Sequence, residues 1–423
     1  MKKKARQKGT LVAALDLGST KIACFIGKVS DDAGNIDVIG IGHQASRGIK
    51  GGAVIDPDAA EGAIRLAVHA AENMAAPTLQ GFPLRDVVIN LPGTHAESHM
   101  VQVDIQISGQ EVTETDVNRA LSKAQEFALQ PDTELIHTIA TRFAIDGHEG
   151  IKDPRGMYGQ MLRVGTHLVT GQMSALKNLS GCIERSYLDI DAICLSAYAA
   201  GLSSVVDDEM DLGCTVIDMG GGVTSFAVFH GGALQYAGAI PVGGVHVTND
   251  IARGLTTSYA AAERIKTLYG SAMASASDDH ELIDVPPLGE ESDQSSANHV
   301  PRSILVGIIQ PRLEETLELV RERLNDSGLG VQVGRRVVLT GGACQLPGVR
   351  ELTQLILNKQ VRLGRPIRIG GLAEAVSTPA FATSAGLLTY ATTRSHEMPQ
   401  AIAAEASAMP IFDRIKIWLK ENW

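Results

Sequence analysis

The chain opens on two short apolar runs separated by a polar turn, a pattern typical of a β-hairpin. The runs cover 11–15 and 22–27, and the turn between them reads Asp16-Leu17-Gly18-Ser19-Thr20-Lys21. The same order recurs at 215–229, where the turn reads Asp218-Met219-Gly220-Gly221-Gly222-Val223-Thr224. In each copy an aspartate ends a buried-strand pattern and is followed by glycine and hydroxyl residues. A repeat of this kind predicts two similarly built lobes.

A third glycine turn follows the β-branched run at 337–340. Gly341 and Gly342 come before Pro347 and a helical periodicity at 349–357. Glycine in the approach loop and proline near a helix start predict a strand-to-helix turn that contacts a ligand.

Between the two hairpins, the pattern predicts a small inserted subdomain. It contains a strand at 101–107 and a helix from 115 to about 129, with Thr115 as a possible N-cap. Residues 271–300 are rich in Ser, Ala, Asp and Glu and poor in aromatics, so we expect an exposed loop with little regular structure. Residues 395–409 are interpreted as a linker for the same reason.

Size and composition indicate a globular chain with more than one core. A length of 423 residues exceeds what one hydrophobic core supports, and 44% of residues are hydrophobic against 20% charged. The five cysteines are scattered without paired spacing, which argues against a disulfide framework or a zinc site.

Charge and hydropathy limit the partners. The net charge of -11 argues against broad nucleic-acid binding, and no run reaches the ~18 apolar residues of a spanning helix. The first eight residues are nevertheless basic, which indicates either a solvated tail or electrostatic contact with a membrane. Their cationic residues are Lys2, Lys3, Lys4, Arg6 and Lys8.

Two facing glycine turns are suited to a phosphate chain, because backbone N–H groups wrap phosphate oxygens only where no side chain intervenes. One such turn alone is an ordinary hairpin, but two matched copies favour a nucleotide cleft. Asp16 and Asp218 stand where Mg²⁺ needs oxygen ligands, held through water. The predicted phosphate-binding residues are Gly18, Ser19, Thr20, Lys21, Gly220, Gly221, Gly222 and Val223.

A helical pattern at 256–269 ends at Gly270 and places Glu263 and Lys266 three residues apart on one face. Such a pair is equally a surface salt bridge. At the rim of a cleft the same pair can hydrogen-bond a ribose.

These motifs resemble known proteins. The order of two phosphate hairpins and a third glycine turn resembles the superfamily of actin, Hsp70 and sugar kinases. The insert in the first lobe and two further stretches narrow the resemblance to the FtsA family of bacterial cell-division proteins, over residues 11–423. The stretches are Ala144-Ile145-Asp146 with Gly150-Ile151-Lys152-Asp153-Pro154-Arg155-Gly156, and Ile308-Ile309-Gln310-Pro311-Arg312-Leu313-Glu314-Glu315.

The resemblance implies an α/β fold, namely an actin-like pair of ribonuclease-H-like lobes with an FtsA-type inserted α+β subdomain. It divides the chain into a basic tail at 1–9, lobe 1 at 10–90, 168–205 and 366–394, the insert at 91–167, lobe 2 at 206–365 with a partner-binding subdomain at about 255–320, a linker at 395–410 and an amphipathic helix at 411–423.

The resemblance also implies ATP and Mg²⁺ as ligands. It places a further phosphate contact at Thr224. It places adenosine contacts at Gly243, Gly244, Glu263, Lys266, Gly341, Gly342 and Ala343. The region 195–201, where enzymes of the superfamily place a residue that orients water, offers only small and neutral groups. No catalytic residue is therefore assigned, and we expect at most slow hydrolysis, with the nucleotide acting as a switch.

The implied partners are the C-terminal tail of the tubulin-like protein FtsZ, further copies of the chain in a protofilament, other division proteins at the insert, and lipid, with no nucleic acid. The expected location is the cytoplasmic face of the inner membrane at the division septum. The resemblance places Arg302, Arg312 and Glu315 in contact with the FtsZ tail. An ordinary exposed helix pair is the alternative for Arg312 and Glu315.

Residues 411–423 predict a helix with one apolar face. Arg414, Lys416 and Lys420 lie mostly elsewhere, and both tryptophans of the chain fall in this segment. A membrane anchor is favoured over a helix docked on the protein's own surface, since a docked helix needs no long tether. The predicted membrane contacts are Ile411, Phe412, Ile415, Trp418, Leu419 and Trp423.

Two alternatives share the nucleotide turns. A sugar or acid kinase would need an acidic base beside a substrate pocket in the first lobe. An actin-like adaptor of type IV pilus assembly should lack both the stretch at 308–315 and the terminal amphipathic helix.

Overall fold

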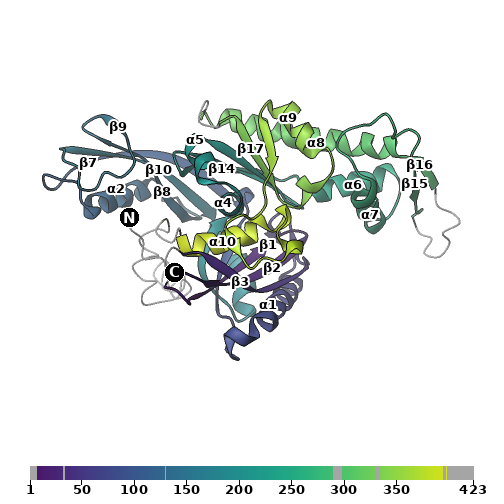
Figure 1. Cartoon of the computed structure of the whole chain (residues 1–423), viewed down its shortest axis with the longest axis horizontal. Helices are drawn as coiled ribbons and strands as arrows, with labels where there is room; N and C mark the ends of the chain where they lie inside the picture. Colours follow the sequence, from purple (N-terminus) through teal and green to yellow (C-terminus); the bar gives the residue numbers. More distant parts are fainter. Residues whose placement is uncertain are drawn as a thin grey trace.

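The computed structural model describes residues 7–31, 34–128, 130–288, 298–329, 334–393 and 397. Most of the basic tail, the linker apart from Glu397, and the amphipathic helix predicted at 411–423 lie outside the described residues. Two sheets with their helices form the two predicted lobes, and a third sheet forms the insert (Figure 1).

Lobe 1 is built on a six-stranded sheet of order β11-β6-β1-β2-β3-β19. Helices α1 and α3 cover one face, and α4 and α10 lie on the other. The strands are β1 (Leu11–Leu17), β2 (Lys21–Val29), β3 (Ile36–Ala45), β6 (Asp86–Leu91), β11 (Asp189–Leu195) and β19 (Ile369–Gly370); the helices are α1 (Pro57–Leu79), α3 (Met173–Arg185), α4 (Ser196–Ser204) and α10 (Ala382–Thr393). Helix α1 begins where the Asp56 carboxylate accepts the backbone N–H groups of Asp58 and Ala59.

Lobe 2 is built on a five-stranded sheet of order β14-β13-β12-β17-β18. A distal group of helices and a two-stranded hairpin, β15 with β16, extend from it (Figure 1). The strands are β12 (Cys214–Met219), β13 (Thr224–His230), β14 (Ala233–Ile240), β15 (Leu282–Val285), β16 (Asn298–Pro301), β17 (Arg336–Thr340) and β18 (Gln360–Leu363); the helices are α5 (Asp207–Leu212), α6 (Gly244–Gly254), α7 (Tyr259–Tyr269), α8 (Arg302–Asp326) and α9 (Val349–Leu357).

The two lobes meet along α4 and α10, which pack against each other. Every residue of α4 is buried, and so is nearly all of α10. A Cβ atom on Gly386 of α10 would lie 1.6 Å from the carbonyl oxygen of Ala199 in α4, so only glycine permits this crossing. The contact fixes α10 beside the ends of β1 and β12, where the candidate site lies.

The insert is a four-stranded sheet of order β7-β10-β8-β9 with α2 packed on it. It contacts lobe 2 as well as lobe 1, because the Ser98 hydroxyl donates to the Ala237 carbonyl at 2.8 Å and accepts the Ala237 N–H at 3.2 Å. Its elements are β7 (Ala96–Gln106), α2 (Glu114–Gln125), β8 (Thr133–Ile145), β9 (His148–Ile151) and β10 (Met161–Gln172). The boundary predicted at 167 falls inside β10.

Two local predictions were wrong. Helix α2 is capped by Thr113, whose hydroxyl accepts the Asp116 N–H while Asp116 accepts the Thr113 N–H, so Thr115 lies inside the helix. The stretch at 271–300 contains β15 and the beginning of β16, which pair from Leu282 opposite Pro301 to Val285 opposite Asn298. Ile283 and Val285 are buried and hold the hairpin against lobe 2, which the polar composition of the stretch did not indicate.

Candidate functional site

The two glycine turns have the same geometry. Strand β1 pairs with β2 so that Asp16 lies opposite Ala23, and β12 pairs with β13 so that Asp218 lies opposite Ser225. In the first turn the Gly18 N–H donates to the Lys21 carbonyl at 3.0 Å; in the second the Gly220 N–H donates to the Val223 carbonyl at 3.0 Å. The sequence repeat is therefore a structural repeat.

The turns face each other across a cleft of about 530 Å³ between the lobes. The cleft is lined by both aspartates and by most of the predicted nucleotide residues. These are Asp16, Gly18, Ser19, Thr20, Lys21, Asp218, Gly220, Gly221, Gly222, Val223, Gly244, Glu263, Lys266, Gly341, Gly342 and Ala343.

Thr224 and Gly243 do not line the cleft. The Thr224 side chain is buried, and its hydroxyl donates to the Val242 carbonyl at 2.8 Å. Gly243 precedes α6 and donates its N–H to His246 Nδ1 at 3.1 Å. Both residues lie behind the turns, outside the lining of the cleft.

Adjacent hydroxyls at the start of α10 hold the two aspartates. Thr383 donates to Asp218 Oδ2 at 3.0 Å, and Ser384 donates to Asp16 Oδ2 at 2.8 Å. One helix end therefore fixes a carboxylate from each lobe.

Burial raises the pKa values of Asp16 and Asp218. Burial raises the pKa of Asp16, although Lys21 and the Ser384 hydrogen bond oppose the rise. Burial and the neighbouring Asp16 charge raise the pKa of Asp218 to about 7. Two desolvated carboxylates side by side favour a cation between or beside them.

Lys21 lines the cleft together with the two aspartates. Its ammonium donates to the Ala380 carbonyl and lies 3.3 Å from the centroid of the Phe381 ring. Burial lowers the pKa of Lys21, and the charges of Asp16 and Asp218 oppose that shift. The lysine is thus a partly desolvated cation available to phosphate oxygens.

The residues predicted to contact adenosine lie at the far end of the cleft. Lys266 Nζ donates to Glu263 Oε2 at 2.8 Å, to Thr248 Oγ1 at 2.7 Å and to the Gly244 carbonyl at 3.2 Å. Glu263 and Lys266 therefore belong to a network that joins α7 to α6 at the cleft. The Glu263 side chain is 46% exposed and has room to accept a hydrogen bond from a ligand.

Gly341 is required by its own geometry. Its φ is +86°, and a Cβ atom there would lie 2.5 Å from Asp218 Oδ1. Any other residue would displace the aspartate or the turn.

Several cleft residues were missed by the sequence analysis. Asn90, at the end of β6, accepts the Leu17 N–H at 2.7 Å and donates to Ser196 Oγ at 3.1 Å, so it braces the first turn. Thr383 and Ser384 act on the aspartates from more than 160 residues away. The strand pattern before Pro92 was an available signal for Asn90, whereas no local pattern marks the two hydroxyls.

The residues predicted to contact a partner lie on α8, outside the cleft. Arg312 Nε donates to Asp250 Oδ2 at 2.5 Å, and its guanidinium also pairs with Glu315. Arg302 pairs with Asp278 at 3.0 Å and with Glu281 at 3.1 Å. These arginines already hold neighbouring elements together, so their contact with a partner stays a prediction.

Two structural searches apply to the described part of the chain alone. No helix there is long and apolar enough to cross a membrane. Within the same residues, no group of three or more His, Cys, Asp or Glu side chains is arranged to hold a metal. Asp16 and Asp218 form a pair, which suits a cation that keeps most of its water ligands.

This architecture, with two lobes and matched turns facing a central cleft, is that of the actin-like proteins. Among solved structures, a chain of the PilM-PilN type IV pilus biogenesis complex matches with a TM-score of 0.63 and 17% identity, over 90% of this chain and 98% of that one. MreB5 of Spiroplasma citri bound to ADP matches with a TM-score of 0.54 and 14% identity, over 90% and 95%. At these identities the likeness concerns the fold.

Sequence comparison identifies the family. The model described as cell division protein FtsA matches residues 215–386, and the SHS2 domain inserted in FtsA matches residues 93–170. The FtsA of Rhizobium meliloti (strain 1021) is 42% identical over 98% of this chain and 95% of its own length. The FtsA of Escherichia coli (strain K12) is 32% identical over 98% of each chain. The chain belongs to the FtsA family of cell division proteins, which confirms the resemblance and the predicted fold class.

Proposed function

We propose that this chain binds ATP with Mg²⁺ between its lobes, self-associates into protofilaments and attaches FtsZ filaments to the cytoplasmic face of the membrane at the division septum. The observation that carries the nucleotide part is the matched pair of turns, each with an aspartate at the same register and a glycine N–H closing the same hydrogen bond. Family membership supports the role in division.

The cleft residues divide the work. Backbone N–H groups of the two turns and the Lys21 ammonium face the space where phosphates would lie. Asp16 and Asp218 would hold Mg²⁺ through water, and the ion would neutralise phosphate charge. Glu263 and Lys266 would contact the ribose. The solved structure of MreB5 of Spiroplasma citri bound to ADP supports a nucleotide in a cleft of this fold.

Hydrolysis is proposed to be slow at most. The carboxylates Asp16 and Asp218 would be engaged with Mg²⁺. Ser196 and Asn90 also line the cleft, and both are neutral and hydrogen-bonded to each other. Neither group can take a proton from water in the way that a carboxylate or imidazole does. The nucleotide would then set a conformational state instead of supplying work.

Calorimetry with ATP and Mg²⁺ tests the cleft. Asp16→Ala and Asp218→Ala should each weaken binding, whereas Asp208→Ala, a change on the exposed first turn of α5, should not. Unchanged affinity in both cleft variants would remove the nucleotide site from this proposal.

Pelleting with anionic liposomes tests the membrane part. The full chain should pellet with liposomes and, when FtsZ is added, carry it down. Trp418→Glu and a chain ending at Met409 should both stay in the supernatant without losing ATP affinity, because they remove apolar contacts at the interface. Pelleting of the shortened chain would show that the attachment lies elsewhere.

A further inference from the structure

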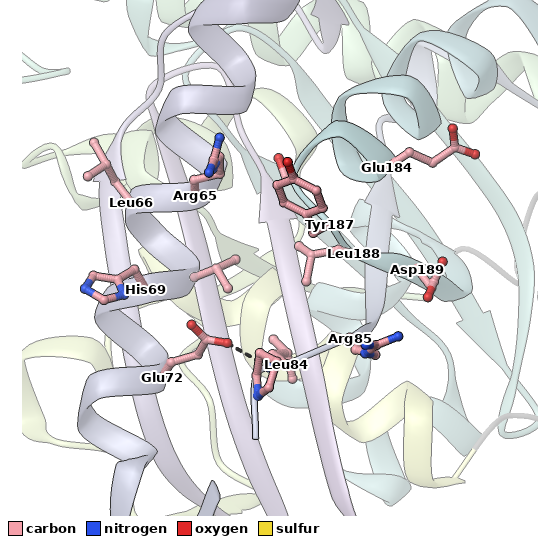
Figure 2. Close-up of a pocket in the computed structure, with 13 residues that line it drawn as sticks. Arg65, Leu66, His69, Glu72, Leu84, Arg85, Glu184, Tyr187, Leu188 and Asp189 are labelled. Atoms are coloured by element: carbon pink, nitrogen blue, oxygen red, sulfur yellow. Dashed lines mark hydrogen bonds between the residues drawn. The ribbon is translucent and has the colours of Figure 1, made fainter. Parts of the chain in front are cut away.

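A second recess, of about 910 Å³, opens on lobe 1 away from the nucleotide cleft. Helix α1 forms one wall, from which Arg65 and Glu72 point inward, and the turn from α3 into β11 forms the other, with Tyr187 and Asp189 (Figure 2). Leu66 and His69 of α1 also line the recess. The parallel strands β6 and β11 begin here, whereas Asn90 near the end of β6 and Ser196 directly after β11 line the cleft. The recess therefore has no part in the nucleotide site.

Large apolar side chains stand exposed around this recess. Leu66 is 59% exposed and Tyr187 80% exposed, and Phe82, beside the lining residue Pro83, is 75% exposed. Isolated exposed apolar residues are ordinary, but several around one hollow mark an interaction surface.

The backbone at Tyr187 is strained. Leu188 N–H donates to the Ile183 carbonyl at 3.2 Å and Tyr187 N–H to the Glu184 carbonyl at 2.9 Å, which is the helix ending that normally has glycine at the position of Tyr187. Tyr187 has φ +62°, a rare conformation for a bulky side chain. The Arg65 guanidinium lies 5.6 Å from the centre of its ring and holds it at the mouth of the recess (Figure 2). The packing of lobe 1 nevertheless leaves Tyr187 80% exposed.

We propose that the recess is a docking site for the chain's own residues 411–423, which lie there when no membrane is available. This inference rests on the proposed function of the segment as the membrane anchor, and adds its regulation. The membrane and the recess would then compete for the same apolar face.

The length of chain permits the contact. The last described residue, Glu397, accepts a hydrogen bond at 2.6 Å from Tyr198 in α4, which directly follows β11. Strand β11 has seven residues and leads from Tyr198 to the recess at Asp189. Seven residues span roughly 23 Å, whereas the fourteen steps from Glu397 to Ile411 reach roughly 45 Å.

The chemistry of the two surfaces is complementary. The recess presents three carboxylates against two guanidinium groups, together with apolar Val68, Leu84 and Leu188. The segment presents three cations against two carboxylates, beside its apolar face. The charged residues of the recess are Glu72, Glu184, Asp189, Arg65 and Arg85; those of the segment are Arg414, Lys416, Lys420, Asp413 and Glu421.

Tryptophan fluorescence reports on the segment alone, because Trp418 and Trp423 are the only tryptophans of the chain. In full-length protein without lipid, emission should lie at shorter wavelength than in the free 411–423 peptide and resist acrylamide quenching. Leu66→Glu and Tyr187→Gly should move emission and quenching to the values of the peptide. Tyr187→Gly should also leave the fold intact, since glycine suits that backbone.

Leu355→Glu is the matched control, because Leu355 is 68% exposed on α9 of lobe 2. It should leave the emission unchanged. Emission of the wild-type protein equal to that of the peptide would overturn the proposal, and so would protection that neither recess variant removes. Protection that appears only as protein concentration rises would assign the contact to a neighbouring copy and would overturn docking within one chain.

Liposome titration separates this inference from the proposed function. If the segment is docked in nine of ten molecules, Leu66→Glu should pellet at about tenfold lower lipid concentration. Binding of the free peptide to the same liposomes tests the anchor independently. Equal lipid dependence of wild type and Leu66→Glu would overturn the docking while leaving the anchor in place.

Discussion

Thr20 and Gly221 approach each other across the cleft so closely that a Cβ atom on Gly221 would lie 2.3 Å from Thr20 Cγ2. The neighbouring Gly222 is equally constrained, with Ser19 Oγ at 2.6 Å and the Gly51 nitrogen at 2.9 Å from such an atom. Absent side chains in the second turn therefore set how closely the lobes approach.

Gly222→Ala should accordingly weaken ATP binding. The added methyl group meets backbone of Gly51, which cannot rotate away as a side chain can, so the turns are forced apart. We expect a loss of about tenfold in affinity, or ~1.4 kcal/mol. Gly62→Ala in α1, where no atom lies within 4 Å, is the control for calorimetry and should keep full affinity. Equal affinities in the two variants would contradict the arrangement.

Nucleotide binding should depend on pH through Asp218. Because its pKa is raised to about 7, a proton must leave the carboxyl before it faces Mg²⁺, and affinity should fall as pH falls below 7. Asp218→Asn should bind ATP more weakly at every pH, and its affinity should lack the part of the pH dependence that comes from Asp218. Calorimetry in two buffers of different ionisation heat counts the released protons; identical proton release in wild type and Asp218→Asn would assign the titration to another group.

Glu209 should stabilise the contact between α5 and the edge of the lobe 2 sheet. It is 4% exposed and accepts from Arg362 Nε at 2.9 Å and Arg336 at 3.3 Å. Burial favours a raised pKa, but the hydrogen bonds and charge of Arg362 outweigh it and hold the pKa below its usual value. Glu209→Gln leaves both guanidinium groups without a counter-charge, and we expect a loss of about 1–3 kcal/mol in unfolding free energy.

The sign of the pH dependence follows from that lowered pKa. The ion pair contributes fully above the unfolded-state pKa of about 4.3 and is lost as pH falls through the folded value. The difference between wild type and Glu209→Gln in urea unfolding should therefore be large at pH 7 and shrink below pH ~4. Glu351→Gln, at an exposed pair with Arg350, should have little effect at either pH. A difference that persists in acid would refute the ion-pair account.

The role of Arg312 is open to a paired test. Arg312→Gln and Asp250→Asn break the same ion pair from its two sides, so a structural role predicts equal effects on stability and on peptide binding. Contact with the FtsZ tail peptide predicts a loss of affinity in Arg312→Gln alone, measured by fluorescence anisotropy. Equal peptide affinity in the two variants would place the peptide elsewhere.

The sequence pattern correctly predicted those elements whose hydrogen bonds join residues close together in the sequence. Both hairpins and helix α9 lie where apolar periodicity and glycine placed them, because their hydrogen bonds join residues a few positions apart. The cap of α2 was misplaced by two residues, since Thr113 and Thr115 are equally suited by type and only the Asp116 contact distinguishes them.

Long-range partners could not be predicted in this way. Thr383 and Ser384 reach the aspartates because Gly386 lets α10 press on α4, a packing that no single segment encodes. The family resemblance places Arg312 at a partner contact, but it gives no indication that Asp250 already pairs with this guanidinium.

The hydrogen bonds between Ser98 and Ala237 have a mechanical consequence. The insert is continuous with lobe 1 by its backbone, yet it is fastened to β14 of lobe 2 at this point. A rotation that narrows the cleft must either break this fastening or drag the insert with it. In the second case a small rotation at the cleft produces a larger displacement at β9, the far end of the insert (Figure 1).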